Sequence, residues 1–214
     1  MDGNGRWAKK RHLPRVAGHR AGVEAVRRTV RAAGDLGLEA LTLYAFSSEN
    51  WKRPEEEVND LMGMMKRFII SELDEFAEAG VRLHVIGNWR AMAPDVVELV
   101  QRAIDRTATN TKTSLAVALN YGAQDELVRA AQAAAGEGAI TAEAIERHLD
   151  TASLPPLDLL IRTSGEVRLS NFLLWQSAYA EMLFTDTLWP DFGHDDLAAA
   201  VTEFARRERR YGGL

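Results

Sequence analysis

The stretch LEALTLYAFS at residues 38–47 is short, rich in apolar side chains and followed by polar turn residues. Three further stretches share this character: VRLHVIG at 81–87, SLAVALNYG at 114–122 and LDLLIRTSG at 157–165. Near-continuous hydrophobicity over so few residues is typical of strands that are covered on both faces of a parallel sheet. We therefore predict buried strands in one mainly parallel central sheet.

Helical patterns separate the predicted strands. In residues 19–37, Val23, Val26 and Val30 recur at helical spacing, and the stretch 55–80 repeats that pattern before it stops at a glycine. Further helices are expected at 93–107, 124–135, 141–149 and 194–210. Because strands that alternate with helices build βαβ units, residues 1–214 are predicted to form a single α/β domain with helices flanking the sheet.

Composition narrows the possible functions. The chain has 214 residues, no cysteine and a formal net charge of −5, which excludes disulfides and disfavours a general nucleic-acid binder. No apolar run approaches the roughly 18–20 residues that span a bilayer, and no signal peptide is expected, so we predict a cytoplasmic protein. Arginine and lysine crowd into residues 6–31 and 206–210, and this local positive charge suggests a compact anionic ligand.

Unusual polar residues follow the predicted strands. SSENWKRP comes after the strand at 38–47, and RTSGEVRLSN comes after the strand at 157–165. DGNGRW, at residues 2–7, lies where another strand would have just ended. Because ligands of open α/β sheets bind outside the carboxyl ends of the strands, these three segments are candidates for one site.

The glycines of DGNGR let the backbone approach a ligand and turn its N–H groups toward an anion. A helix beginning near Gly18 and His19 would add its positive end. Asp2 offers the hard oxygen ligand that Mg²⁺ prefers beside phosphate. The alternative is a solvated N-terminal tail with an Asx turn.

The segment after the last predicted strand pairs two arginines with hydroxyl groups. Arg162 and Arg168 could hold one phosphate group through bidentate contacts, with Ser170 donating its hydroxyl. The alternative is structural, with both arginines paired to Glu166 and Glu181. In SSENWKRP an ordinary helix N-cap is the competing interpretation, and the histidines show no spacing typical of a zinc site.

Taken together, these segments resemble the cis-prenyltransferase family, in particular its undecaprenyl diphosphate synthases. MDGNGRWAKKR, GHRAG, LTLYAFSSENWKRP, LNYG, DLLIRTSGEVRLSNFLLWQSAYAE and FTDTLWPDF stand in the family's order and rough spacing over nearly the whole chain. The resemblance implies Mg²⁺-dependent condensation of isopentenyl diphosphate with an allylic diphosphate, expected to be farnesyl diphosphate. It also implies a long-chain cis-polyprenyl product, expected to be undecaprenyl diphosphate.

The resemblance also assigns roles to individual residues. Asp2 matches the metal-associated carboxylate, and Asn50 matches the residue proposed to take part in proton removal. Residues matching the binding site for the allylic diphosphate are Gly3, Asn4, Gly5, Arg6, Trp7, Arg15 and His19, with Trp7 beside the prenyl chain. Residues of the second block are Ser47, Ser48, Glu49, Trp51 and Arg53, and those matching the grip on isopentenyl diphosphate are Arg162, Arg168, Leu169 and Ser170. Glu181 matches a second Mg²⁺ ligand that acts across a homodimer interface.

The sequence departs from the family pattern in three places. The family has a hydrophobic strand before MDGN, whereas only Met1 precedes Asp2 here, so we expect the first strand to be missing and residues 1–17 to form a mobile or misplaced loop. The family's RTGGE is RTSGE, with Ser164, and its AELYF is AEMLF, with Met182 and Leu183.

Several expectations stay open at the level of sequence. The helix at 55–80 is a candidate wall of an apolar tunnel for the prenyl chain, or plain core. The aromatic-rich segment 172–192 suits a dimer interface or the core, and Arg210-x-Gly212 resembles the family's tail motif. Alternative functions are a short- or medium-chain synthase and a non-catalytic scaffold subunit. Membrane association would be peripheral, to deliver the product.

Overall fold

The computed structural model describes residues 1–207, which form an α/β domain. The elements are α1 (Asn4–Lys10), α2 (Arg15–Asp35), β1 (Ala40–Ser47), α3 (Glu55–Glu78), β2 (Val81–Ile86), α4 (Pro94–Thr107), β3 (Thr113–Tyr121), α5 (Ala123–Glu137), α6 (Ala142–His148), β4 (Leu159–Arg162), β5 (Glu181–Phe184) and α7 (His194–Arg206). Among these described residues, no helix is long and apolar enough to cross a membrane.

All strand pairs are parallel, as the hydrophobic runs predict. β3 lies between β1 and β2, and Val117 is paired with Leu43 on one side and Val85 on the other. β4 pairs with β5 in a second, two-stranded sheet. The prediction of one central sheet is therefore wrong in this respect, because within residues 1–207 β1 and β4 do not pair with each other.

A cavity of about 1660 Å³ separates the two sheets. It is lined by every residue from 38 to 45 and from 154 to 163. Successive side chains of a strand point to opposite faces of the sheet. Because consecutive residues line the cavity, it is bordered by the edges of these strands and not by one face of a sheet. The facing edges of β1 and β4 are thus the border between the two halves of the domain.

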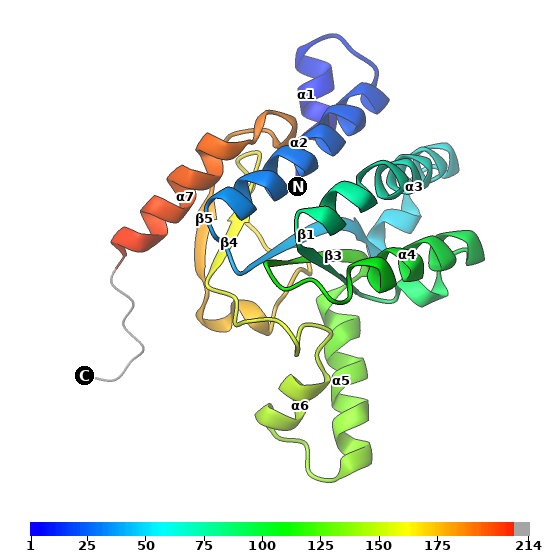
Figure 1. Cartoon of the computed structure of the whole chain (residues 1–214), viewed down its shortest axis with the longest axis vertical. Coiled ribbons are helices and arrows are strands. Elements are labelled where there is room, and N and C mark those ends of the chain that lie inside the picture. Colours follow the sequence, from blue (N-terminus) through cyan, green and yellow to red (C-terminus); the bar gives the residue numbers. More distant parts are fainter. Residues whose placement is uncertain (208–214) are drawn as a thin grey trace.

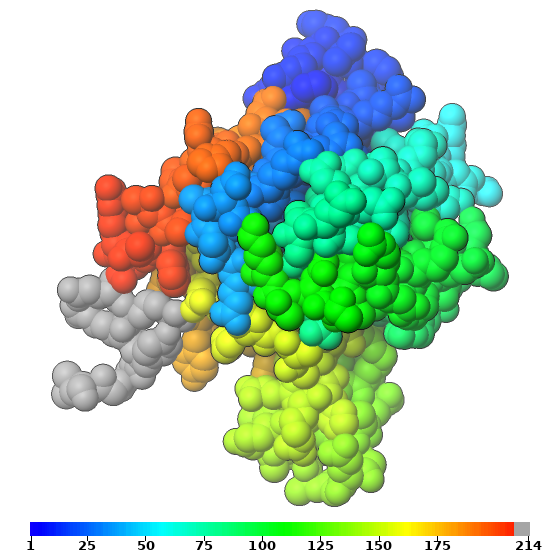
Figure 2. All heavy atoms as spheres, in the orientation of Figure 1, coloured from blue at the N-terminus to red at the C-terminus, as the bar shows by residue number. Residues whose placement is uncertain are grey.

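Helices cover the sheets as expected for an α/β fold (Figure 1). α2 packs against β1 and α7, and its buried residues Ala25, Val30 and Ala33 share a core with Leu43 and Leu115. α3 and α4 cover the β1-β3-β2 sheet with a second core. α5 and α6 project from the rest as a lobe (Figure 2).

The structure corrects the start of the second helix and the expected N-terminal loop. α2 begins at Arg15, not near Gly18, and residues 4–10 are helical. Gly18 allows close helix contact instead of starting a helix, because a Cβ there would lie 2.0 Å from the carbonyl oxygen of Asn4. β5 is a strand that the sequence did not indicate, since four residues are too few to show a period. The tail motif at 210–212 lies outside the described residues.

Candidate active site

Asp2 is fixed through its main chain. Its N–H donates to Thr163 Oγ1 at 2.9 Å, the same hydroxyl donates back to the Asp2 carbonyl at 2.9 Å, and the Trp189 N–H donates to that carbonyl at 2.9 Å. Thr163 directly follows β4 and is buried. The segment before α1 is therefore held at the carboxyl end of β4, where sequence analysis placed it.

The Asp2 carboxylate faces Arg162. Arg162 Nη2 donates to Asp2 Oδ2 at 3.0 Å, and the Gly3 N–H donates to Oδ1 at 2.7 Å. Partial burial acts to raise the pKa of Asp2, but these two hydrogen bonds outweigh it and leave the pKa below its ordinary value. The carboxylate is ionised at neutral pH, and its side chain remains 41% exposed.

Arg162 connects Asp2 with the loop that follows β4. Its Nη1 donates to Ser170 Oγ at 2.8 Å and to the carbonyl oxygen of Arg168. The structure thus brings Arg162 and Ser170 together, as predicted for a phosphate contact. The structural alternative holds for Arg168, whose guanidinium pairs with Glu166.

Arg6 reaches the same loop from α1. Its guanidinium donates to the Ser164 carbonyl oxygen at 2.9 Å and to Ser164 Oγ at 2.6 Å, and it lies 3.0 Å from Glu166. Glu166 therefore bridges Arg6 and Arg168. Three arginines, counting Arg162, converge on this loop and give it a positive field suited to a diphosphate.

Glu57, in the first turn of α3, contacts a second group of basic side chains. Its carboxylate lies 3.2 Å from Arg15, 2.9 Å from Arg53 and 3.6 Å from His19. Burial lowers the pKa of His19 and outweighs the opposing charge of Glu57, so the imidazole is mostly neutral at pH 7. Arg15 also packs over Gly5, at 3.5 Å from where a Cβ would be.

Asn50 lies in a short 3₁₀ helix, Ser48–Lys52, that follows β1. Its Oδ1 accepts the Ser47 N–H at 3.1 Å within the short helix. The N-cap of α3 is Pro54 with no side-chain cap, so the interpretation of a Ser or Asn cap for that helix is wrong. Glu49 accepts from Asn171 at 2.8 Å and ties this segment to the loop after β4. Trp51 turns outward, is 45% exposed and donates to Asn120 at 2.8 Å.

Most of the predicted residues border the large cavity. Those lining it are Asp2, Gly3, Asn4, Gly5, Arg6, Arg15, His19, Ser47, Asn50, Arg53, Arg162, Arg168, Leu169 and Ser170. A smaller apolar cavity of about 190 Å³ lies between α2, α3 and the β1-β3-β2 sheet. Asn4, His19 and Leu43 line both cavities, so the apolar cavity opens beside the polar site.

Five predicted residues do not line the large cavity. Ser48, Glu49 and Trp51 belong to the 3₁₀ helix after β1, and Trp7 and Glu181 lie elsewhere. Trp7 donates to Asp191 at 2.6 Å, stacks with Arg11 and lines neither cavity. Glu181 begins β5 beside Leu159, at the opposite end of the strand pair from Arg162, and accepts from Arg207 at 2.8 Å. Within one chain, Glu181 does not join Asp2.

The site fits Mg²⁺ only if substrate phosphates supply some of the metal ligands. In the part of the chain that the structure describes, no group of three or more acidic, histidine or cysteine side chains could hold a metal ion. Mg²⁺ is commonly bound by one or two carboxylates together with substrate phosphates. The ionised, partly exposed carboxylate of Asp2 beside the arginines matches that donor set.

The sequence did not indicate that Thr163 and Glu57 organise the site, and it indicated Glu166 only as a partner of Arg162 or Arg168, not of Arg6. Their partners Asp2, Arg15 and Arg6 lie far away in the sequence. Only the tertiary fold shows these contacts. A threonine directly after an apolar strand, such as Thr163, is a weak signal of a buried hydrogen-bonding residue.

The family model described as "Putative undecaprenyl diphosphate synthase" matches residues 1–212. The isoprenyl transferase of Zymomonas mobilis subsp. mobilis is 59% identical over 222 aligned positions, covering 100% of this chain and 90% of that protein. The isoprenyl transferase of Agrobacterium fabrum is 54% identical with the same coverage.

Two solved structures have the same fold. Lavandulyl diphosphate synthase from Lavandula x intermedia, in complex with dimethylallyl diphosphate, has a TM-score of 0.95 and 31% identity, covering 100% of this chain and 95% of that one. A probable undecaprenyl diphosphate synthase from Campylobacter jejuni has a TM-score of 0.83 and 32% identity, covering 91% and 93%. The chain belongs to the undecaprenyl diphosphate synthase (isoprenyl transferase) family of cis-prenyltransferases, and it is a prenyltransferase.

Proposed function

We propose that this chain condenses isopentenyl diphosphate with an allylic diphosphate, farnesyl diphosphate by preference, to give a long cis-polyprenyl diphosphate such as undecaprenyl diphosphate. The observation that carries the proposal is an anion site at the mouth of an apolar cavity. Arg6 and Arg162 gather at Asp2, and Asn4 lines both the polar and the apolar space. A prenyl diphosphate likewise has a charged end, which suits the polar space, and a hydrocarbon tail, which suits the apolar one.

The polar residues would stabilise the charge that develops when the allylic diphosphate ionises. Arg6 and Arg15 offer preorganised donors to the leaving diphosphate, which lowers the barrier most where water is excluded. Arg162 and Arg168 hold the diphosphate of isopentenyl diphosphate. Ser170, already in contact with Arg162 at 2.8 Å, adds a hydroxyl donor. Mg²⁺, held by Asp2 together with diphosphate oxygens, would supply further charge stabilisation.

Positioning supplies the remaining part of the mechanism. The new C–C bond joins the allylic C1 to the isopentenyl C4, and a proton is then lost from the isopentenyl C2. An amide is too weak a base to remove that proton near neutral pH. We propose that the departing diphosphate or a water accepts the proton and that Asn50 orients the acceptor through its amide donor.

The apolar cavity would receive the growing chain. Its α3 wall includes Met62, Met64, Met65 and Phe68. Methionine side chains are unbranched and polarisable, so they adapt to a ligand whose length changes from one condensation to the next. This arrangement favours the tunnel interpretation of α3 over plain core.

The placement of Glu181 makes its metal role dependent on a second chain. It lies at the far end of β4 and β5 from Arg162, so a role beside Asp2 requires a homodimer in which the Glu181 end of one copy meets the Asp2 end of the other. We propose such a homodimer, with peripheral attachment to a membrane surface that receives the product.

The test is to incubate the protein with Mg²⁺, farnesyl diphosphate and labelled isopentenyl diphosphate, and to measure product length. Elongated cis product that needs both substrates is the expected result. A short product would assign a short- or medium-chain synthase. Absence of any elongated product would contradict the proposal and favour a scaffold subunit on the same fold.

A further inference from the structure

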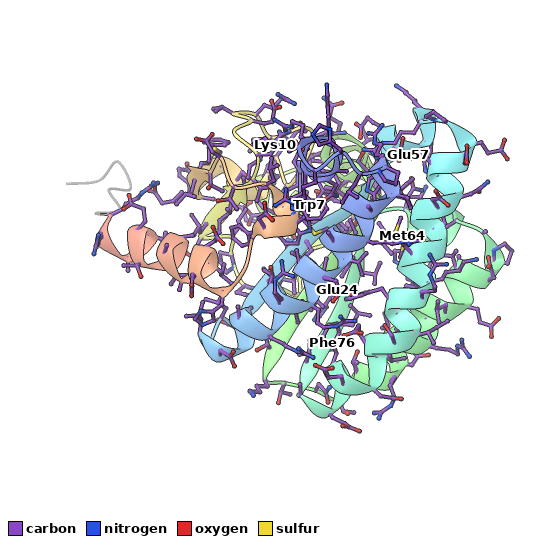
Figure 3. The ribbon with its side chains drawn as sticks, turned by 90° about the horizontal axis from the view of Figure 1, so that it is seen from above. Trp7, Lys10, Glu24, Glu57, Met64 and Phe76 are labelled. Atoms are coloured by element: carbon purple, nitrogen blue, oxygen red, sulfur yellow. The ribbon has the colours of Figure 1, made fainter. Side chains whose placement is uncertain are left out.

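A charged pair, Arg27 on α2 and Glu72 on α3, closes the boundary between these helices near the far end of the apolar cavity, where Phe76 is the last α3 residue that lines it. The α3 side chains that line this cavity run from Leu61 to Phe76 and are apolar except for Glu72. On α2 the lining ends at Val26, and the next residue is Arg27. In Figure 3, α2 and α3 run side by side, with Glu57 and Phe76 at opposite ends of α3.

Arg27 on α2 forms a bidentate ion pair with Glu72 on α3. Its Nε donates to Glu72 Oε2 at 2.6 Å, and its Nη2 donates to Oε1, which also accepts from Ser71 Oγ at 2.9 Å. The Glu72 side chain is 5% exposed and that of Arg27 is 25% exposed. Hydrogen bonds from Arg27 hold the pKa of Glu72 below its ordinary value, so the pair is ionised.

This pair differs physically from the rest of the cavity wall. Methionines such as Met62 and Met65 can shift to admit a hydrocarbon chain. Hydrocarbon that pushes between Arg27 and Glu72 would leave the buried Glu72 carboxylate without its ionic partner, while Arg27 keeps its contact with Glu24. Isolating a buried carboxylate is far more costly than moving a thioether. The cavity wall can therefore change shape where methionines of α3 form it, and it is rigid at the Arg27–Glu72 ion pair.

We propose that Arg27 and Glu72 are specificity-determining residues whose ion pair closes the apolar cavity between α2 and α3 and limits the length of the alkyl chain that it accepts. The inference rests on the proposed function, because that chain is the tail of the prenyl diphosphate. Past the pair only Leu73 and Phe76 of α3 still line the cavity, so a chain that cannot displace the pair has little room left to grow.

The test uses the double variant Arg27→Met/Glu72→Met. Replacing a buried ion pair with apolar side chains of similar volume usually preserves stability or increases it. A matched control is Arg31→Met/Glu75→Met, which removes the next ion pair along the same two helices. That pair has a 2.8 Å contact, is 55% and 47% exposed, and does not line the cavity.

The measurement is the affinity for a series of n-alkyl diphosphates of increasing length. Each methylene that enters the cavity should tighten binding about fourfold, until the chain reaches the closed end. We expect binding to the original protein and to the control variant to level off at the same length. In the Arg27→Met/Glu72→Met variant it should continue to tighten over several more methylenes.

An unchanged levelling point in the folded double variant would overturn the inference. If thermal unfolding shows that this variant does not fold, Arg27→Gln/Glu72→Gln removes both charges with polar side chains, and the same comparison applies to it. Elongation by the original protein is measured separately. Its absence would reject the proposed function, whereas the alkyl series still decides whether the ion pair limits chain length.

Discussion

Asn50 combines a structural and a proposed catalytic duty in one amide. Its oxygen accepts the Ser47 N–H at 3.1 Å, which leaves the NH₂ group as the part free to act on substrate. This division agrees with a role in orienting a proton acceptor and disagrees with a role as the base. The family resemblance pointed to the residue, and the hydrogen bond indicates which half of the amide matters.

Asn50→Ala should lower kcat far more than it weakens diphosphate binding, by roughly 10²-fold or more. Asn50→Asp keeps an oxygen for the Ser47 N–H and removes the donor, so it should be similarly slow while it stays folded. Steady-state kinetics and equilibrium binding of farnesyl diphosphate measure both effects. Equal losses of kcat and affinity in Asn50→Ala would contradict the assignment.

Ser164 occupies a backbone conformation that favours glycine. Its φ is 79°, in the left-handed region, which costs a side chain bearing a Cβ about 1–2 kcal/mol. Ser164→Gly should therefore raise Tm by about 2–8 °C, less the effect of losing the hydrogen bond from Arg6 to the Ser164 hydroxyl. Ser164→Ala keeps the strain and loses the bond, so it should melt lowest. A glycine variant less stable than the alanine variant would refute this.

At the scale of elements, the contact between α1 and α2 positions the segment that carries Asp2. Gly18→Ala would place a methyl group 2.0 Å from the Asn4 carbonyl oxygen, so α1 must move. We expect a loss of about 1–3 kcal/mol and weaker diphosphate binding. Gly34→Ala, on the same helix, is the control, because no atom lies within 4 Å of the position that its Cβ would take. Equal stability of the two variants would contradict this packing role.

The elements could be predicted where their patterns were long. The strands at 38–47 and 114–122 and the helix at 55–80 follow from hydrophobic runs and periodicity, and the structure confirms them. α1 could not be predicted, because its seven residues contain only two apolar side chains, Trp7 and Ala8, and show no apolar period; contact with α2 stabilises the helix. β5 depends on its pairing with β4, which no local pattern reveals.

At the scale of the molecule, sequence analysis predicted which segments meet but not how their charges pair. The residues after β1 and β4 converge with residues 2–6, because parallel strands end at one edge. The pairs Glu57 with Arg15 and Glu166 with Arg6 were missed, since both form only through the fold. The division into two sheets also emerged only in three dimensions.

The cavity between β1 and β4 is suited to an extended segment. Met1 lines it, together with both strand edges, so residues joined ahead of Met1 would enter it directly. We predict that an apolar, strand-forming segment added there raises Tm and turnover by pairing with the unpaired backbone groups. A glycine- and serine-rich segment of equal length is the control. The same Tm for both additions would show that no strand forms.

The central claim is that Asp2, fixed between Thr163 and Arg162, serves prenyl transfer at a diphosphate site. The most direct measurement is the rate of isopentenyl incorporation by Asp2→Asn, which keeps an oxygen for the Gly3 N–H and removes the charge. We predict a loss of at least about 10²-fold with Tm little changed. A folded Asp2→Asn variant that incorporates isopentenyl units at the original rate would contradict the account.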